Sequence, residues 1–294
     1  MGRDVSRWIR ILVWLLWPMA MLPASASPSS SEAEVTEAKR ITLATLEWPP
    51  YVAQRLKGRG YVHELVVTAL ERAGYEVHVK FVPWPRAVRE ASVGEVDGIF
   101  PAYYTKERTR QLAFSTPFAG GPVGLYKRKD TPARYPVDPR SNPVAALQGI
   151  REHTVGVVRG YANPLAVDNA DFLNKETAKS DLVNLRRLYH KRVGLIVIDK
   201  FVADYLLETL LKEYREELEF MHPPLELKYF YVAFSPKAPN YQEKLEAFNR
   251  GLAQITEDGT LKRIYEQHGV STVLHYEHDL SSTGLQEEAG KPAN

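Results

Sequence analysis

Short strand patterns alternate with helix patterns along most of the sequence, and this alternation limits the folds that the chain can adopt. Residues 41–46 place alternate side chains on one face, and residues 75–81 place Tyr, Val, Val and Phe at every second position. Between them, residues 61–73 have a helix pattern that ends before Gly74. Strand, helix and strand in this order form a β-α-β unit, which favours two parallel strands with a helix on their face. The sequence therefore predicts an α/β fold.

The alternation continues to residue 268, and a proline-rich stretch divides it. Helices are expected at 86–93, 162–173, 181–191, 199–214, 240–257 and 260–268, and strands at 98–102, 123–127, 154–158, 193–198 and 229–234. Residues 130–143 contain several prolines and charges, so we expect the chain to leave a first lobe just before them. The residues that follow repeat the strand and helix alternation as a second lobe.

The two ends of the chain have a different composition from the rest. Residues 1–26 carry three arginines, a short apolar stretch and the small residues Ala24-Ser25-Ala26, which together are typical of a secretory signal peptide cleaved after Ala26. The apolar stretch is too short to span a bilayer as a helix. We expect residues 27–38 to be a flexible lead-in and residues 277–294 to be a disordered tail. The expected product is a soluble protein of the periplasm.

Charge and cysteine content exclude several classes of function. The full chain has a net charge of +2, and residues 1–26 contribute three Arg and one Asp, so the remainder has a charge of about zero (+2 − 2). A neutral chain without a basic block argues against nucleic acid as a partner. The chain has no cysteine, which excludes disulfides, thiol nucleophiles and a lipidated cysteine. Its eight histidines lack metal-ligand spacing, so we expect no metal and no cofactor.

Candidate binding residues follow the strand patterns, since open α/β sheets bind ligands beyond the carboxyl ends of their strands. Trp48 and Trp84 both stand beside prolines just after a strand, where stiff loops would hold them as ligand walls. The alternative is that each fills the edge of the core. A ligand interpretation is favoured because two such loops occur in one lobe.

Two charged residues have both a structural and a functional interpretation. Thr105 is a natural helix N-cap, and it places Arg108 in a first turn, where a positive charge is unfavourable. Arg108 is therefore either a solvated surface residue or a ligand for a carboxylate, with Thr105 and backbone N–H groups assisting. Asp199 is either a simple N-cap between a strand and a helix or a carboxylate that receives an ammonium group.

Several short strings occur in a set order and spacing along residues 40–269. They are Trp48-Pro49-Pro50-Tyr51 with Gly60-Tyr61, Gly94-Glu95-Val96-Asp97-Gly98, Thr105-Lys106-Glu107-Arg108, Phe114-Ser115-Thr116-Pro117-Phe118, Val155-Gly156-Val157-Val158-Arg159-Gly160, Val197-Ile198-Asp199 and Asp258-Gly259-Thr260-Leu261. In these strings the chain resembles the periplasmic amino-acid-binding proteins, family 3 of the extracellular solute-binding proteins. The resemblance implies a two-lobed type II periplasmic-binding-protein fold, each lobe a mostly parallel sheet flanked by helices, with two hinge strands joining them. It implies a first lobe of residues 39–127 plus 232–276 and a second lobe of residues 128–231.

The resemblance also implies roles for individual residues. Trp48 and Trp84 would sandwich the ligand, Arg108 would pair with its α-carboxylate, and Asp199 would receive its α-ammonium. The expected ligand-binding set is completed by Tyr51, Arg86, Tyr103, Thr105, Gly160 and Tyr161, with Arg86 as a second anion contact.

The chain departs from the family pattern at the expected floor of the pocket. Pro101, Tyr103 and Tyr104 stand where small residues and threonine often line the pocket, and Tyr161 follows Gly160 where threonine or serine is common. These departures leave the identity of the ligand open.

The resemblance implies a binding protein and not an enzyme. It would capture an amino acid or a related small anion or zwitterion by hinge closure and deliver it to the permease of an ABC transporter in the inner membrane. One alternative is a sensory partner that reports the ligand to a membrane protein. The other is a dehydratase on the same scaffold, with Glu47 or Glu64 as acid or base. The sequence shows no nucleophilic residue paired with a general base, which argues against this alternative.

Overall fold

The computed structural model describes residues 40–270 of the chain. The expected signal peptide, the lead-in and the tail therefore lie outside the described residues. Within residues 40–270, no helix is both long enough and apolar enough to cross a membrane.

The described strands form one continuous sheet with a parallel group at each end. The strand order is β2-β1-β3-β10-β5-β8-β6-β7, with β4 added beside β10 and β9 beside β5. The strands are β1 (Arg40–Thr45), β2 (Glu76–Phe81), β3 (Gly98–Ala102), β4 (Ala113–Phe114), β5 (Phe118–Arg128), β6 (Val155–Val158), β7 (Lys175–Ala178), β8 (Leu195–Asp199), β9 (Leu218–Phe220) and β10 (Glu226–Phe234). The group β2-β1-β3 is parallel, and so is the group β8-β6-β7.

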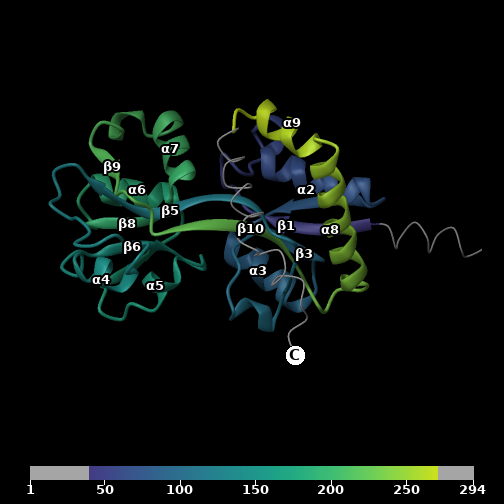
Figure 1. The fold of residues 1–294 in the computed structure, drawn as a ribbon, viewed down its shortest axis with the longest axis horizontal. Coiled ribbons are helices and arrows are strands. Elements are labelled where there is room, and N and C mark those ends of the chain that lie inside the picture. The colour runs from purple at the N-terminus through teal and green to yellow at the C-terminus, as the bar shows by residue number, and fades with distance from the viewer. Residues whose placement is uncertain (1–39, 271–294) are drawn as a thin grey trace, which may run out of the picture. The chain divides into compact units, whose positions relative to one another are not determined.

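Two long strands connect these groups. β10 pairs antiparallel with β3 on one side and with β5 on the other, and β5 in turn pairs antiparallel with β8. In Figure 1, β5 and β10 run together from the elements of one group to those of the other. We call β1–β3 with their helices the first lobe and β6–β8 with their helices the second lobe. This is the expected two-lobed α/β fold with two hinge strands.

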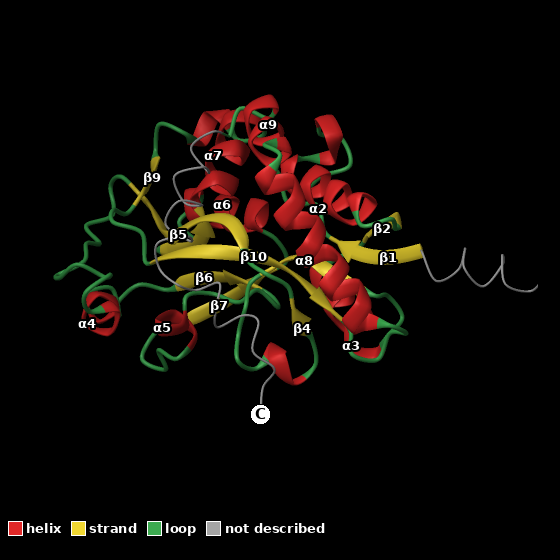
Figure 2. Ribbon diagram, turned by 45° about the vertical axis from the view of Figure 1, so that its right-hand side comes forward, coloured by secondary structure: helices red, strands yellow, loops and turns green. Residues whose placement is uncertain are grey.

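Helices cover both parallel groups, as the β-α-β pattern predicts. They are α2 (Tyr61–Arg72), α3 (Trp84–Val93), α4 (Pro143–Gln148), α5 (Leu165–Asp168), α6 (Asp181–Tyr189), α7 (Lys200–Thr209), α8 (Tyr241–Glu257) and α9 (Thr260–Gln267). In the first lobe, α2 packs on α8 and α9, and α3 packs on β1 and β3. In the second lobe, α6 packs on β6 and β8, and α7 packs on β5 (Figure 2).

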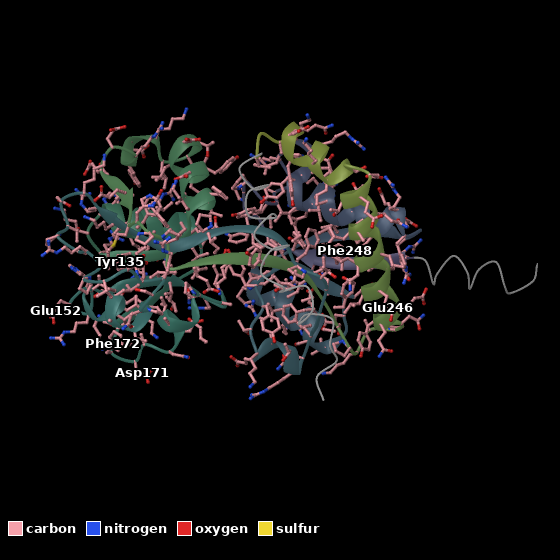
Figure 3. The ribbon with its side chains drawn as sticks, in the orientation of Figure 1. Tyr135, Glu152, Asp171, Phe172, Glu246 and Phe248 are labelled. Carbon is pink, nitrogen blue, oxygen red and sulfur yellow. The ribbon has the colours of Figure 1, made fainter. Side chains whose placement is uncertain are left out.

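The long helix α8 shows how the chain returns to the first lobe. Phe248 of α8 is fully buried and packs its ring against Phe118 at the start of β5 and Phe234 at the end of β10. Glu246, two residues earlier, is exposed on the same helix (Figure 3). α8 therefore covers the place where both hinge strands meet the first lobe.

The structure corrects the expected elements of the second lobe. The predicted helix at 162–173 is wrong: only Leu165–Asp168 is helical, and the strand β7 that follows was not predicted. β7 has the polar sequence Lys-Glu-Thr-Ala, and its pairing with β6 at the edge of the sheet determines its conformation. The helix expected over 199–214 ends at Thr209, after which Lys212–Tyr214 forms a separate 3-10 turn. At β7, tertiary pairing overrides the local pattern.

Candidate functional site

The first candidate wall of the site, Trp48, lies in a tight turn after β1. Its backbone exchanges hydrogen bonds with Val52, and two prolines stiffen the residues between them. The indole is buried, with 6% of its surface exposed, and its Nε1 donates a 3.0 Å hydrogen bond to Oδ2 of Asp181. Asp181 is the first residue of α6, so this bond joins the first lobe to the second.

A second connection between the lobes centres on Asp199. The hydroxyl of Tyr51 donates to its Oδ1 at 2.8 Å, and the hydroxyl of Tyr103 donates to its Oδ2 at 3.2 Å. Asp199 is also the N-cap of α7, since Oδ1 accepts from the backbone N–H groups of Phe201 and Val202. The carboxylate of Asp199 thus caps a helix of the second lobe and also accepts hydrogen bonds from two tyrosine hydroxyls of the first lobe.

A third connection joins Arg108 and Trp84 to Gly160. Nη1 of Arg108 donates to the carbonyl of Tyr103, and Nη2 donates to the carbonyl of Gly160, both at 2.9 Å. The same Gly160 carbonyl accepts a 3.1 Å bond from Nε1 of Trp84, whose ring centroid lies 5.7 Å from the guanidinium carbon. Gly160 has φ +77°, which L-residues adopt only with strain, and its carbonyl faces Trp84 and Arg108 of the first lobe.

These residues surround a small cavity of about 20 Å³. It is lined by Leu46, Trp48, Trp84, Pro101, Tyr103, Arg108, Tyr161 and Ala162, which come from both lobes. The rings and aliphatic side chains make the lining mostly apolar. Arg108 is the one charged side chain in this lining.

Burial changes the acidity of both carboxylates beside the cavity. Loss of solvent raises the pKa of Asp199 to about 7, although the hydrogen bond from Tyr51 opposes this shift. Burial also raises the pKa of Asp181 to about 6, against hydrogen bonds from Trp48 and from the hydroxyl of Tyr161 at 3.2 Å. Burial lowers the pKa of the Arg108 guanidinium. Neutral donors, and not cations, thus surround the two buried acids.

The remaining candidates have other partners. Nε of Arg86 donates to Glu90 one helical turn away at 2.7 Å, and the Arg86 side chain is 57% exposed, so the structure does not bring it into the cavity. Oγ1 of Thr105 accepts from the backbone N–H of Arg108 at 3.2 Å, which is the expected capping contact. The turn that follows is a short 3-10 turn, Arg108–Arg110, and not an α-helix.

Sequence reasoning missed Asp181. Because β7 was not predicted, the start of α6 was not seen to follow a strand, and so Asp181 was not placed at the carboxyl edge of the sheet. The signal was present in Ser180-Asp181, since the Ser180 hydroxyl caps α6 by accepting from the N–H of Val183. Within residues 40–270, no cluster of three or more His, Cys, Asp or Glu side chains is arranged to hold a metal ion.

Comparison with known proteins decides the family. Residues 41–271 match the bacterial extracellular solute-binding proteins, family 3. The chain belongs to this family. None of the curated proteins matches it in sequence.

Solved structures show the same two-lobed fold at low sequence identity. A mutant of ArgBP from T. maritima is 18% identical with a TM-score of 0.65, over 80% of this chain and 97% of that one. A histidine kinase sensor domain with similarity to periplasmic binding proteins is 19% identical with a TM-score of 0.66, over 78% and 95%. The substrate-binding protein of an amino acid ABC transporter is 15% identical with a TM-score of 0.62, over 78% and 98%.

In this solute-binding fold, the candidate residues come from the carboxyl ends of strands in both lobes. Trp48 and Tyr51 follow β1, Tyr103 follows β3, Gly160 follows β6, and Asp199 ends β8. The structure therefore brings most of the candidates to one place. Their contacts with a ligand, including that of Asp199 with an ammonium group, stay predictions.

Proposed function

We propose that this family member captures a small carboxylate-bearing solute, an amino acid or a related compound, between its two lobes. The observation that carries this proposal is the position of Arg108. Its guanidinium lines the cavity, and within residues 40–270 it forms no ion pair with a carboxylate. Its two hydrogen bonds to carbonyls use two of its five N–H groups, and the others are available to an anion.

The contacts between the lobes support capture by closure. Candidate residues of the first lobe make five hydrogen bonds to the second lobe, which are Trp48–Asp181, Tyr51–Asp199, Tyr103–Asp199, Trp84–Gly160 and Arg108–Gly160. A typical hydrogen bond contributes about 0.5–1.5 kcal/mol to stability, so this set is large enough to bias a hinge toward closure. The hinge would be β5 and β10, which connect the two parallel groups.

We infer that the protein acts in the periplasm, as the partner of the permease of an ABC transporter. The extracellular family and the leader-like residues 1–26 support this location, and the fold shared with an ABC transporter substrate-binding protein supports this partner. A sensory role is the second candidate, because a histidine kinase sensor domain shares the fold equally well. Recovery of a transporter permease or of a sensor kinase from membranes by the tagged protein distinguishes the two roles.

A thermal-shift screen of amino acids, dipeptides and small organic anions tests the binding function. A solute that binds only the folded protein raises its melting temperature, and calorimetry then measures its dissociation constant. Arg108→Gln is expected to weaken binding of the best carboxylate more than tenfold. Arg110→Gln, which removes an exposed arginine from the same 3-10 turn, serves as the matched control. Unchanged affinity in Arg108→Gln would contradict the assignment.

A further inference from the structure

Asp181 is a buried acid to which neither the resemblance nor the proposed function gives a role. Its residue is 5% exposed, and its Oδ2 accepts from Nε1 of Trp48 at 3.0 Å and from the hydroxyl of Tyr161 at 3.2 Å. Both of these donors line the cavity. Within residues 40–270, the groups that act on the acidity of Asp181 include no Lys, Arg or His. A carboxylate is therefore buried beside the cavity without a compensating positive charge.

Asp181 and Asp199 lie close enough to act on the same side chains. Burial and Asp199 raise the pKa of Tyr103, and the charge of Asp181 raises it further. Burial and Asp181 raise the pKa of Tyr161, and the charge of Asp199 adds to that effect. Among the described residues, no cation contributes to the acidity of Asp199 either. The second lobe thus holds two neighbouring carboxylates that share only neutral donors.

Separation of the lobes removes most of the side-chain donors of these acids. The closed cavity, about 20 Å³, has room for about one water molecule, so the lobes separate before a solute enters. Asp181 then keeps Tyr161, and Asp199 keeps the backbone N–H groups of α7. The donors that move away belong to the first lobe, and they are Trp48, Tyr51 and Tyr103. A positively charged solute can replace them.

The charges of the site do not balance for a neutral amino acid. Its carboxylate would pair with Arg108 and its α-ammonium with Asp199, as the resemblance implies, and Asp181 would stay without a cation. Burial raises the pKa of Asp181 to about 6, which reflects the cost of holding this charge out of water. A buried charge is favourable only when it is paired, so a second positive group on the solute would balance the site.

On the basis of the proposed function, we propose that the solute is an amino acid whose side chain ends in a cationic group, and that Asp181 binds this group. Arg108 binds the α-carboxylate and Asp199 the α-ammonium. The rings of Trp48 and Tyr161 lie beside Asp181 in the cavity lining, and aromatic rings also attract cations. Asp181 is then the residue that selects a cationic side chain over a neutral one.

Pairs of amino acids of nearly the same shape that differ in side-chain charge test this inference. L-lysine is compared with L-norleucine, and L-arginine with L-citrulline, each titrated by calorimetry into the full protein. We expect the cationic member to bind at least about tenfold more tightly in the pair that fits best, because it adds a charge-assisted hydrogen bond.

Equal or tighter binding of the neutral member would overturn the inference and leave the proposed function intact. The same holds if another carboxylate of the thermal-shift screen binds and neither lysine nor arginine does. If no carboxylate binds at all, the inference and the proposed function both fail.

Two variants separate the role of Asp181 from that of Asp199. Asp181→Asn keeps an acceptor for Trp48 and Tyr161 but removes the charge, and we expect the affinity ratio within the best pair to fall close to one. Asp199→Asn is expected to weaken both members alike, because both carry the α-ammonium. Asp171→Asn, which removes an exposed acid of the second lobe, is the matched control (Figure 3). A ratio that is unchanged in Asp181→Asn, or that is lost in Asp199→Asn instead, would contradict the assignment.

Discussion

The hydroxyl of Tyr51 donates a 2.8 Å hydrogen bond to the carboxylate of Asp199, a residue 148 positions further along the chain. Tyr51 belongs to the turn after β1, and Asp199 belongs to the end of β8, so the bond holds one lobe against the other. Both side chains are buried, and the bond is to a group that also starts a helix. Closure of the lobes and the order of α7 therefore depend on the same carboxylate.

Tyr51→Phe removes this bond and keeps the buried ring. A hydrogen bond to a charged or partly charged group contributes about 1.5–3 kcal/mol, so we expect the solute's dissociation constant to rise on the order of tenfold. Calorimetry with the best solute measures the change. Tyr104→Phe removes a hydroxyl from an exposed tyrosine beside the site and is the control. Equal affinity in both variants would contradict the role of Tyr51.

Trp48→Phe tests the bond from Trp48 to Asp181. The substitution keeps an aromatic wall but loses Nε1, which leaves Asp181 with one fewer donor in a buried position. The loss of one partner from a buried acceptor costs about 1–3 kcal/mol, so we expect a lower melting temperature and weaker solute binding. Differential scanning calorimetry measures the melting temperature. If the Trp48→Phe variant had the melting temperature of the wild type, the indole N–H would not stabilise the contact between the lobes.

The raised pKa of Asp181 predicts a pH dependence of stability. Because burial raises this pKa from 3.8 to about 6, the native state favours the protonated acid. This contribution to stability is fully present below pH 4 and is lost as the pH rises through about 6. Asp181→Asn, a neutral isostere, is therefore expected to be more stable than wild type at pH 8, by roughly 1–3 kcal/mol.

The advantage of Asp181→Asn should shrink as the pH falls to 5. Melting temperatures of wild type and variant over this range measure it, and the difference cancels the other titrating groups. A constant difference from pH 5 to pH 8 would show that Asp181 has an ordinary pKa. Because the pKa of Asp199 is raised to about 7, the stability that its protonated form contributes is expected to be lost in the same way, at a slightly higher pH.

Gly121→Ala tests how tightly the hinge strand β5 encloses the Tyr51–Asp199 pair. The added Cβ would lie 2.2 Å from the Tyr51 hydroxyl oxygen, too close for either atom to stay in place. We expect the pair to separate, with lower stability and a larger radius of gyration by small-angle scattering. A variant of wild-type radius and solute affinity would show that the strand yields instead.

The sequence alone determined the succession of elements in the first lobe and the positions where the site begins. Helix and strand periods, Gly74 at a helix end and prolines around Trp48 and Trp84 are local signals, because they depend only on neighbouring residues. The same signals placed Thr105 beside Arg108 and Asp199 at the start of a helix, and the structure has both contacts.

Only the tertiary structure decided which groups meet. β7 is a strand because β6 lies beside it, and no periodicity within Lys-Glu-Thr-Ala indicates this. Asp181 reaches Trp48 because the packing of the two lobes brings the residue after β7 against the turn after β1, although the residues are 133 positions apart. Asp199 has tyrosine hydroxyls as partners, and Arg108 reaches the carbonyl of Gly160, because long-range packing selects partners that sequence spacing does not record. Thus the chain pattern locates the candidate residues, whereas the packing of the lobes determines which charges remain open to a solute.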